Sequence, residues 1–95
     1  MPARRRYLAC YDIRDPRRLT RMRRVMKRYG YPVQYSVFVC DLDGMEMACL
    51  RREARAVMLL NCDSLVVIDL GAVGLERFEF LGARELPPDG TAWIV

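Results

Sequence analysis

The order of apolar and polar positions divides the chain into alternating extended and helical segments. Residues 7–13 form a short apolar run rich in aromatic residues, which is typical of a buried strand. Asp15 and Pro16 follow, and they suit the N-cap and the first position of a helix. We expect this helix to extend to about Tyr29 and to end with Gly30 in the left-handed conformation.

The predicted helix has an apolar face and a basic face. At about 100° per residue, the apolar arc that should face the core consists of Leu19, Met22, Val25, Met26 and Tyr29. A separate basic stripe consists of Arg17, Arg21, Arg24 and Arg28, and it is widened by Arg23 and Lys27.

The middle of the chain predicts a second extended segment, a second helix and a further strand. Residues 33–40 are extended, and the pattern leaves open whether they form one strand or two pieces separated by a bend near Ser36. A turn over 41–44 precedes a helix that we expect over 45–60. Residues 64–70 then form a continuous apolar run, which favours a central strand.

Two further strands are expected near the C-terminus. Residues 76–81 alternate and should form an edge strand, and the apolar residues 91–95 follow a break at Pro87 and Pro88. The whole order predicts an α+β sandwich of ferredoxin-like type, with two helices on one face of a mainly antiparallel sheet. We therefore expect a core domain over 1–82, followed by a linker and a C-terminal strand over 83–95.

Such a sheet leaves its second face bare, and the chain is small. With 95 residues, it should bury only about 60–65% of the surface that its unfolded form exposes. A second copy covering the bare face is the simplest remedy, so we predict a homodimer in which the terminal strand pairs with the partner's sheet. Phe38, Trp93 and Ile94 are the predicted interface residues. Phe38 and Tyr35 suit a core or dimer contact better than a platform for base stacking.

Charge is unevenly distributed. Residues 1–30 hold eleven of the sixteen basic residues and two of the twelve acidic ones, a net charge of +9, whereas residues 31–95 carry a net charge of −5. A basic first third favours nucleic acid as the partner, although a surface charged for solubility remains an alternative. The residues that we expect to contact phosphates are Arg14, Arg17, Arg18, Arg21, Arg24, Arg28 and Ser36.

Other residue types exclude some chemistries. The chain has no histidine, so a histidine base and a Ser/His/Asp triad are both ruled out. The four cysteines are separated by gaps of 30, 9 and 13, which does not suit a zinc site. No apolar stretch is long enough for a membrane helix, and the N-terminal apolar run is short for a signal peptide, so we expect a cytoplasmic protein.

Asp12 is the sharpest candidate for chemistry. It lies at the predicted end of the first strand, beside the basic helix. A carboxylate there can hold Mg²⁺, and two copies across a dimer axis would make a more complete site than one. Alternatively, Asp12 is satisfied by backbone amides of the turn or paired with a nearby arginine.

Three segments together resemble the CRISPR-associated protein 2 family. They are Tyr11-Asp12-Ile13-x-Asp15, the arginine-rich helix that ends in Tyr29-Gly30, and Val33-Gln34-x-Ser36-Val37-Phe38. The resemblance covers residues 6–70 at matching spacing, and residues 78–82 also look like the family's tail.

The resemblance implies a βαββαβ ferredoxin-like fold with an added strand, a homodimer with sheets face to face, and two short strands around Ser36. It also implies that Asp12 meets its dimer mate at one shared Mg²⁺ ion. Arg21 falls where the family's helix commonly carries a basic residue. Near Leu19 the family often has a second basic residue, which is absent here.

By the same resemblance the protein is a Mg²⁺-dependent endonuclease acting on single-stranded RNA or duplex DNA. It would work in spacer acquisition, bridging two dimers of the CRISPR-associated protein 1 integrase. A non-catalytic DNA clamp between the integrase dimers is the main alternative. A toxin-type RNase and a generic RNA-binding domain of the same fold are weaker ones.

Overall fold

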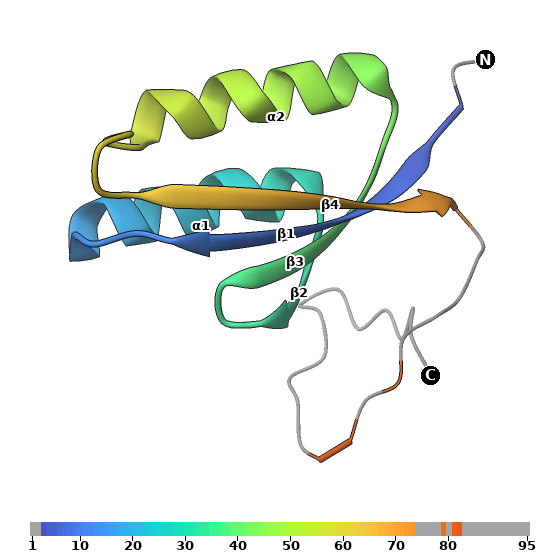
Figure 1. Cartoon of the computed structure of the whole chain (residues 1–95), viewed down its shortest axis with the longest axis horizontal. Helices are drawn as coiled ribbons and strands as arrows, with labels where there is room; N and C mark the ends of the chain where they lie inside the picture. Colours follow the sequence, from blue (N-terminus) through green and yellow to red (C-terminus); the bar gives the residue numbers. More distant parts are fainter. Residues whose placement is uncertain (1–2, 74–78, 80, 83–95) are drawn as a thin grey trace.

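A four-stranded antiparallel sheet and two helices make up the described part of the chain. The computed structural model describes residues 3–73, 79 and 81–82. Its elements are β1 (Arg5–Asp12), α1 (Pro16–Tyr29), β2 (Tyr31–Gln34), β3 (Val37–Leu42), α2 (Gly44–Val57) and β4 (Ser64–Ala72). The strands lie in the order β2-β3-β1-β4, and every neighbouring pair is antiparallel (Figure 1). The predicted α+β fold with βαββαβ order is confirmed.

Some predictions fall outside the described residues. These are the C-terminal strand over 91–95 with Trp93 and Ile94, most of the edge strand expected over 76–81, and the linker that begins at residue 83.

The second extended segment is two strands. A turn at Tyr35 and Ser36 separates β2 from β3, which answers the question that the sequence pattern left open. The two strands pair directly, from Tyr31 opposite Val39 to Gln34 opposite Val37.

Both helices pack on the same face of the sheet. The predicted apolar arc of α1 is confirmed, since Met22, Val25 and Met26 are buried while Leu19 and Tyr29 pack partly against the core. The rest of the buried core consists of Ala9, Tyr11, Ile13, Phe38, Cys40, Leu42, Met47, Leu50 and Ala54. On the other face of the sheet, Val66 and Ile68 of β4 are 53% and 44% exposed.

Gly30 ends α1, but not in the left-handed conformation that we expected. Asp15 is the N-cap, and its side chain accepts a hydrogen bond from the Arg18 N–H. Gly30 has φ −167° and ψ −167°, which is extended backbone. A Cβ atom at this position would lie 2.2 Å from the Val39 carbonyl oxygen and 2.6 Å from the Cys40 Sγ. Glycine is therefore required by the close approach of β3.

The second helix ends at Val57, three residues before the expected end at residue 60. Its start follows the expected turn, since Asp43 and Glu46 form a reciprocal capping box. At the other end, the Asp63 carboxylate accepts the Leu59 N–H at 2.9 Å, and the Leu59 carbonyl accepts the Asp63 N–H at 2.8 Å. These two hydrogen bonds replace the last helical turn with a tight loop.

The central position predicted for the third apolar strand is wrong for the described sheet, where β4 is an outer strand beside β1. Its continuous apolar run has a different cause. Leu65 and Val67 pack against the core, whereas Val66 and Ile68 lie on the open face. Both faces of β4 are therefore apolar, although only one is covered by the helices.

Candidate nucleic-acid interface and catalytic aspartate

Asp12 ends β1 at an exposed position. Its side chain is 65% exposed, and it lies opposite Ser64 in the pairing with β4. The contact that the structure gives it is an Arg14 Nη2 atom 3.5 Å from Asp12 Oδ2, and Arg14 is itself 68% exposed. Such a solvated pair contributes at most about 1 kcal/mol. The carboxylate therefore remains accessible to a cation or a phosphate-bearing ligand.

A buried carboxylate that the sequence analysis missed holds the loop after Asp12. The Asp63 side chain has no exposed surface. It accepts hydrogen bonds from Arg18 Nε at 2.7 Å, the Arg14 N–H at 2.9 Å and the Leu59 N–H at 2.9 Å. The Arg18 guanidinium first, and then these two backbone donors, hold the pKa of Asp63 well below its usual range. The one sequence signal for this role is its place directly before an apolar strand.

Two of the predicted phosphate-binding arginines are already engaged within the chain. Arg18 is 18% exposed, and its guanidinium is bound to the Asp63 carboxylate, which holds the loop after β1. Arg28 pairs with Glu53 of α2, and Glu53 also accepts a hydrogen bond from the Tyr29 hydroxyl. These contacts join the end of α1 to α2.

The rest of the stripe is open to solvent. Arg17, Arg21 and Arg24 are exposed, and none forms a salt bridge with another described residue. They lie on successive turns of one helix face, which is the spacing expected of a track along a polyanion. They are the open part of the basic stripe that the sequence predicts, and the exposed Arg14 lies just before the helix.

Ser36 lies beside the end of β1. Its carbonyl accepts the Tyr11 N–H at 3.1 Å, and the Tyr11 hydroxyl donates to the Tyr35 carbonyl at 3.3 Å. Because Tyr11 directly precedes Asp12, the β2–β3 turn and the candidate catalytic aspartate belong to the same end of the sheet. Ser36 itself is half-buried.

Phe38 does not reach the surface. Its side chain is fully buried and its ring stacks near Tyr11, with the centroids 6.2 Å apart. The expectation that Phe38 forms part of a dimer interface is therefore corrected, because the core of a single chain already encloses it.

Among the described residues, a divalent cation would meet one exposed carboxylate at Asp12 rather than a cluster of ligands. Within residues 3–73, 79 and 81–82, no three His, Cys, Asp or Glu side chains gather closely enough to hold a metal. The exposed Asp12 carboxylate has the oxygen ligands that Mg²⁺ prefers. Asp12 therefore fits Mg²⁺ as one carboxylate ligand.

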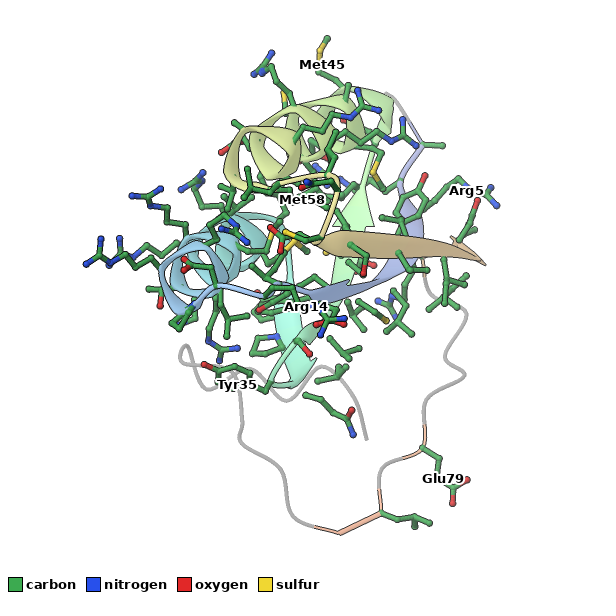
Figure 2. The ribbon with its side chains drawn as sticks, turned by 60° about the vertical axis from the view of Figure 1, so that its left-hand side comes forward. Arg5, Arg14, Tyr35, Met45, Met58 and Glu79 are labelled. Atoms are coloured by element: carbon green, nitrogen blue, oxygen red, sulfur yellow. The ribbon has the colours of Figure 1, made fainter. Side chains whose placement is uncertain are left out.

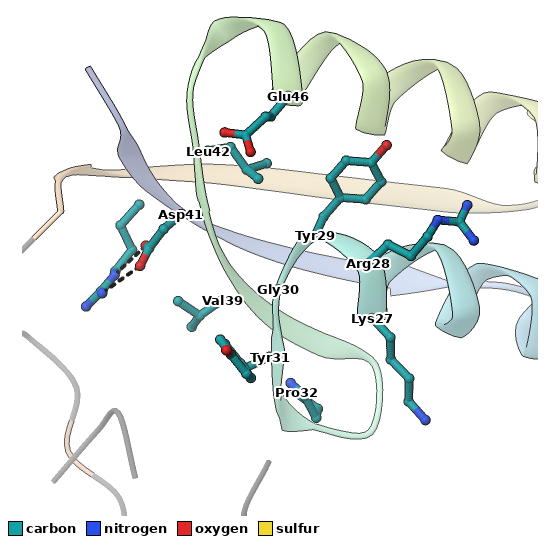
Figure 3. A pocket seen from close by; sticks show the side chains of 11 residues that line it. Lys27, Arg28, Tyr29, Gly30, Tyr31, Pro32, Val39, Asp41, Leu42 and Glu46 are labelled. Carbon is teal, nitrogen blue, oxygen red and sulfur yellow. Dashed lines mark hydrogen bonds and ion pairs between the residues drawn. The ribbon is translucent and has the colours of Figure 1, made fainter. Parts of the chain in front are cut away.

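A hollow of about 570 Å³ lies at the opposite end of β1, between the last turn of α1, β2 and β3 (Figure 3). Its wall includes Lys27, Arg28 and Glu46. Asp41 and Arg6, also in the wall, hold each other through two hydrogen bonds of 2.8 and 2.9 Å. The hollow lies at the other end of β1 from Asp12, and its wall carries both acidic and basic side chains. We therefore do not include it in the candidate site.

The fold and the exposed strand-end aspartate define a small ferredoxin-like α+β domain with a basic first helix. The model of the family described as CRISPR associated protein Cas2 matches residues 5–77, and the chain belongs to this family. The predicted family membership is confirmed.

Two named relatives are similar over most of their length. The CRISPR-associated endoribonuclease Cas2 2 of Thermodesulfovibrio yellowstonii is 37% identical over 85 residues, which cover 90% of this chain and 91% of that relative. The CRISPR-associated endonuclease Cas2 2 of Thermus thermophilus is 37% identical over 83 residues, or 87% and 88% of the two chains.

Solved structures agree with the fold. A hypothetical protein from Thermus thermophilus superposes with a TM-score of 0.77 at 37% identity, over 88% of this chain and 98% of that one. Streptococcus pyogenes Cas2 superposes with a TM-score of 0.73 at 28% identity, over 81% and 99%. Among the helices of the described residues, neither α1 nor α2 has the length and apolar character to span a membrane.

Proposed function

We propose that this protein is a Mg²⁺-dependent endonuclease of CRISPR spacer acquisition that hydrolyses phosphodiester bonds in single-stranded RNA or duplex DNA. The observation that carries the proposal is the accessible Asp12 carboxylate at a strand end, directly before a helix with exposed arginines. The names of the relatives, endoribonuclease and endonuclease, support the same class of reaction.

In this proposal the acidic and basic side chains have different roles. Asp12 holds the cation through its carboxylate oxygens, and the basic stripe holds the phosphates on either side of the scissile bond. When bound, Mg²⁺ supplies Lewis-acid polarisation of the phosphoryl group and acidifies a water molecule. Arg14, 3.5 Å from Asp12, is placed to neutralise charge that develops on the phosphate.

A homodimer completes the site in this proposal. Asp12 of each of two copies would hold Mg²⁺, with the copies meeting through their open sheet faces. The exposure of Val66 and Ile68 on that face supports the contact, because burying apolar side chains stabilises association. The partner in spacer insertion is the CRISPR-associated protein 1 integrase.

Replacement of Asp12 tests the proposal. We expect Asp12→Asn to lower Mg²⁺-dependent cleavage of single-stranded RNA and duplex DNA by at least about 100-fold. The matched control is Asp69→Asn, because Asp69 is also exposed but pairs with Arg5 near the opposite end of β1. Cleavage that persists in highly purified Asp12→Asn protein would make Asp12 a structural turn residue.

A non-catalytic clamp is the second candidate. No cluster of three potential ligands is found among the described residues, so Asp12 is not part of one, and this favours the clamp because a nuclease site usually gathers more ligands. Spacer insertion in the presence of the integrase separates the two functions. If Asp12→Asn loses cleavage but still supports insertion, holding DNA is the cellular role and cleavage is incidental.

A further inference from the structure

We propose that Tyr35 and Arg23 form a stacking platform for one unpaired nucleobase, at the end of the sheet that carries Asp12. This inference rests on the proposed function, since it assumes that nucleic acid follows the basic stripe. It goes further by assigning the platform to single-stranded nucleic acid and by naming a position of base contact.

The first observation is an exposed aromatic ring on a tight turn. Tyr35 is 66% exposed, although tyrosine rings commonly pack their apolar surface against the protein. In Figure 2 it projects outward from the β2–β3 turn. An exposed ring offers a π face, and base stacking on such faces is the common means by which proteins bind single strands.

The second observation is that the ring has a cationic neighbour. The Arg23 guanidinium carbon lies 4.9 Å from the centre of the Tyr35 ring and 5.6 Å from that of Phe38. Arg23 Nη1 also donates to the Tyr35 carbonyl at 2.6 Å. Arg23 therefore lies over one face of the Tyr35 ring, so a base would stack on the other face, with the positive charge of the guanidinium close by.

The third observation is that the turn is held in place before any ligand arrives. Tyr11 is 5% exposed and donates to both residues of the turn, through its N–H to the Ser36 carbonyl and its hydroxyl to the Tyr35 carbonyl. A platform fixed in advance loses little conformational entropy on binding. This anchoring distinguishes Tyr35 from an exposed ring on a loose loop.

Position then connects the platform to the proposed chemistry. Tyr11 directly precedes Asp12 and bonds to the β2–β3 turn, so the platform and the candidate catalytic carboxylate lie at the same end of the sheet. Arg23 belongs to α1, the helix that carries the basic stripe, so the platform and the stripe share one element. Paired bases inside a duplex are stacked on one another and cannot use the platform.

The test compares affinities for a short single-stranded RNA and a duplex DNA of equal length, with a chelator present to prevent cleavage. We expect Tyr35→Ala to weaken RNA binding by about 5- to 100-fold and to leave duplex binding within about twofold. Tyr35→Phe keeps the ring and should restore most of the RNA affinity. Leu60→Ala, at an equally exposed apolar residue of the α2–β4 loop, is the control for the removal of apolar surface.

An abasic substitution gives a second measurement. One base at a time is removed from the RNA, and we expect one position at which the removal weakens binding to the original protein but has no further effect on Tyr35→Ala. Equal reductions of RNA and duplex affinity in Tyr35→Ala, or an unchanged RNA affinity, would overturn the platform. Neither result depends on Asp12, so a failed nuclease proposal and a failed platform give different outcomes.

Discussion

At residue 30 the chain leaves α1 and passes within contact distance of β3. The backbone there is extended, and any residue type could adopt it. The constraint is instead the space beside the Val39 carbonyl and the Cys40 Sγ. The sequence could predict that α1 stops at Gly30, but not why, because the contact joins residues from different elements.

We predict that Gly30→Ala destabilises the fold. The added Cβ would meet a backbone oxygen at 2.2 Å, and relieving such a clash costs about 1–3 kcal/mol or more. In a domain of this size each kcal/mol lowers the melting temperature by about 4–8 °C. Thermal unfolding measures the shift. Gly44→Ala is the control, because its Cβ meets nothing within 4 Å and alanine favours helix. Equal melting temperatures in the two variants would contradict the steric argument.

A second residue-scale prediction concerns cysteine reactivity. Burial, and then the nearby Asp41, raises the pKa of the Cys40 thiol to about 12, whereas Cys62 is exposed. Since the thiolate is the reactive form, Cys40 should resist alkylation at neutral pH until the protein is unfolded, and Cys62 should react readily. Peptide mapping after brief alkylation distinguishes the two sites. Comparable labelling of both in the folded protein would show that Cys40 is accessible.

At the scale of elements, Asp63 joins three segments: the loop after β1, the first turn of α1 and the loop after α2. Sequence periodicity predicted both helices and the sheet strands because those patterns are local. It could not predict this contact, which brings Arg14 and Leu59 to one carboxylate. The early end of α2 and the ion pair of Arg18 both result from Asp63. The sequence therefore predicted neither the end of α2 at Val57 nor the binding of Arg18 within the chain.

We predict that Asp63→Asn lowers the melting temperature at neutral pH by several degrees. The asparagine NH₂ group would face the Arg18 guanidinium and one of the two backbone donors, and donors cannot satisfy one another. Because the folded pKa of Asp63 is lowered, its stabilising effect is present above the unfolded pKa of about 3.9 and is lost as the pH falls through the folded pKa.

The melting temperatures of the original protein and Asp63→Asn should therefore converge as the pH is lowered below about 4. Melting curves collected across that range provide the measurement. Asp69→Asn serves as control, since the Asp69 pair with Arg5 is about half exposed and should contribute less. A gap between the original protein and Asp63→Asn that stays constant with pH would show that the charge of Asp63 is unimportant.

At the scale of the whole molecule, the basic stripe is a feature that the sequence predicted well. Exposure of Arg17, Arg21 and Arg24 follows from helical spacing once the apolar arc is known. The location of Asp12 at a strand end was also predictable, because β1 is a local apolar run. Its exposure and loose pairing with Arg14 depend on neighbouring strands and loops, and the pattern left them open.

We predict that duplex DNA binding depends on salt and on the stripe. Arg21→Glu together with Arg24→Glu should weaken affinity, and the slope of log affinity against log salt should fall by roughly 0.9 for every phosphate that the variant no longer neutralises. The matched control reverses two exposed arginines of α2, Arg51 and Arg55. Titrations over a series of salt concentrations give both slopes. If the α1 and α2 variants behave alike, net charge rather than the stripe governs binding.

The position of β1 between β3 and β4 also determines when the protein becomes complete during its synthesis. Of the four described strands, β1 is synthesised first, and β3 can pair with it before β4 is made. The other edge of β1 can pair only after residues 64–72 are made, and the hydrogen bonds that the Asp63 carboxylate accepts form no earlier. Until then that edge is an open template for other strands. In a partly made chain the arginines of α1 have therefore been synthesised before the loop around Asp12 can be fixed.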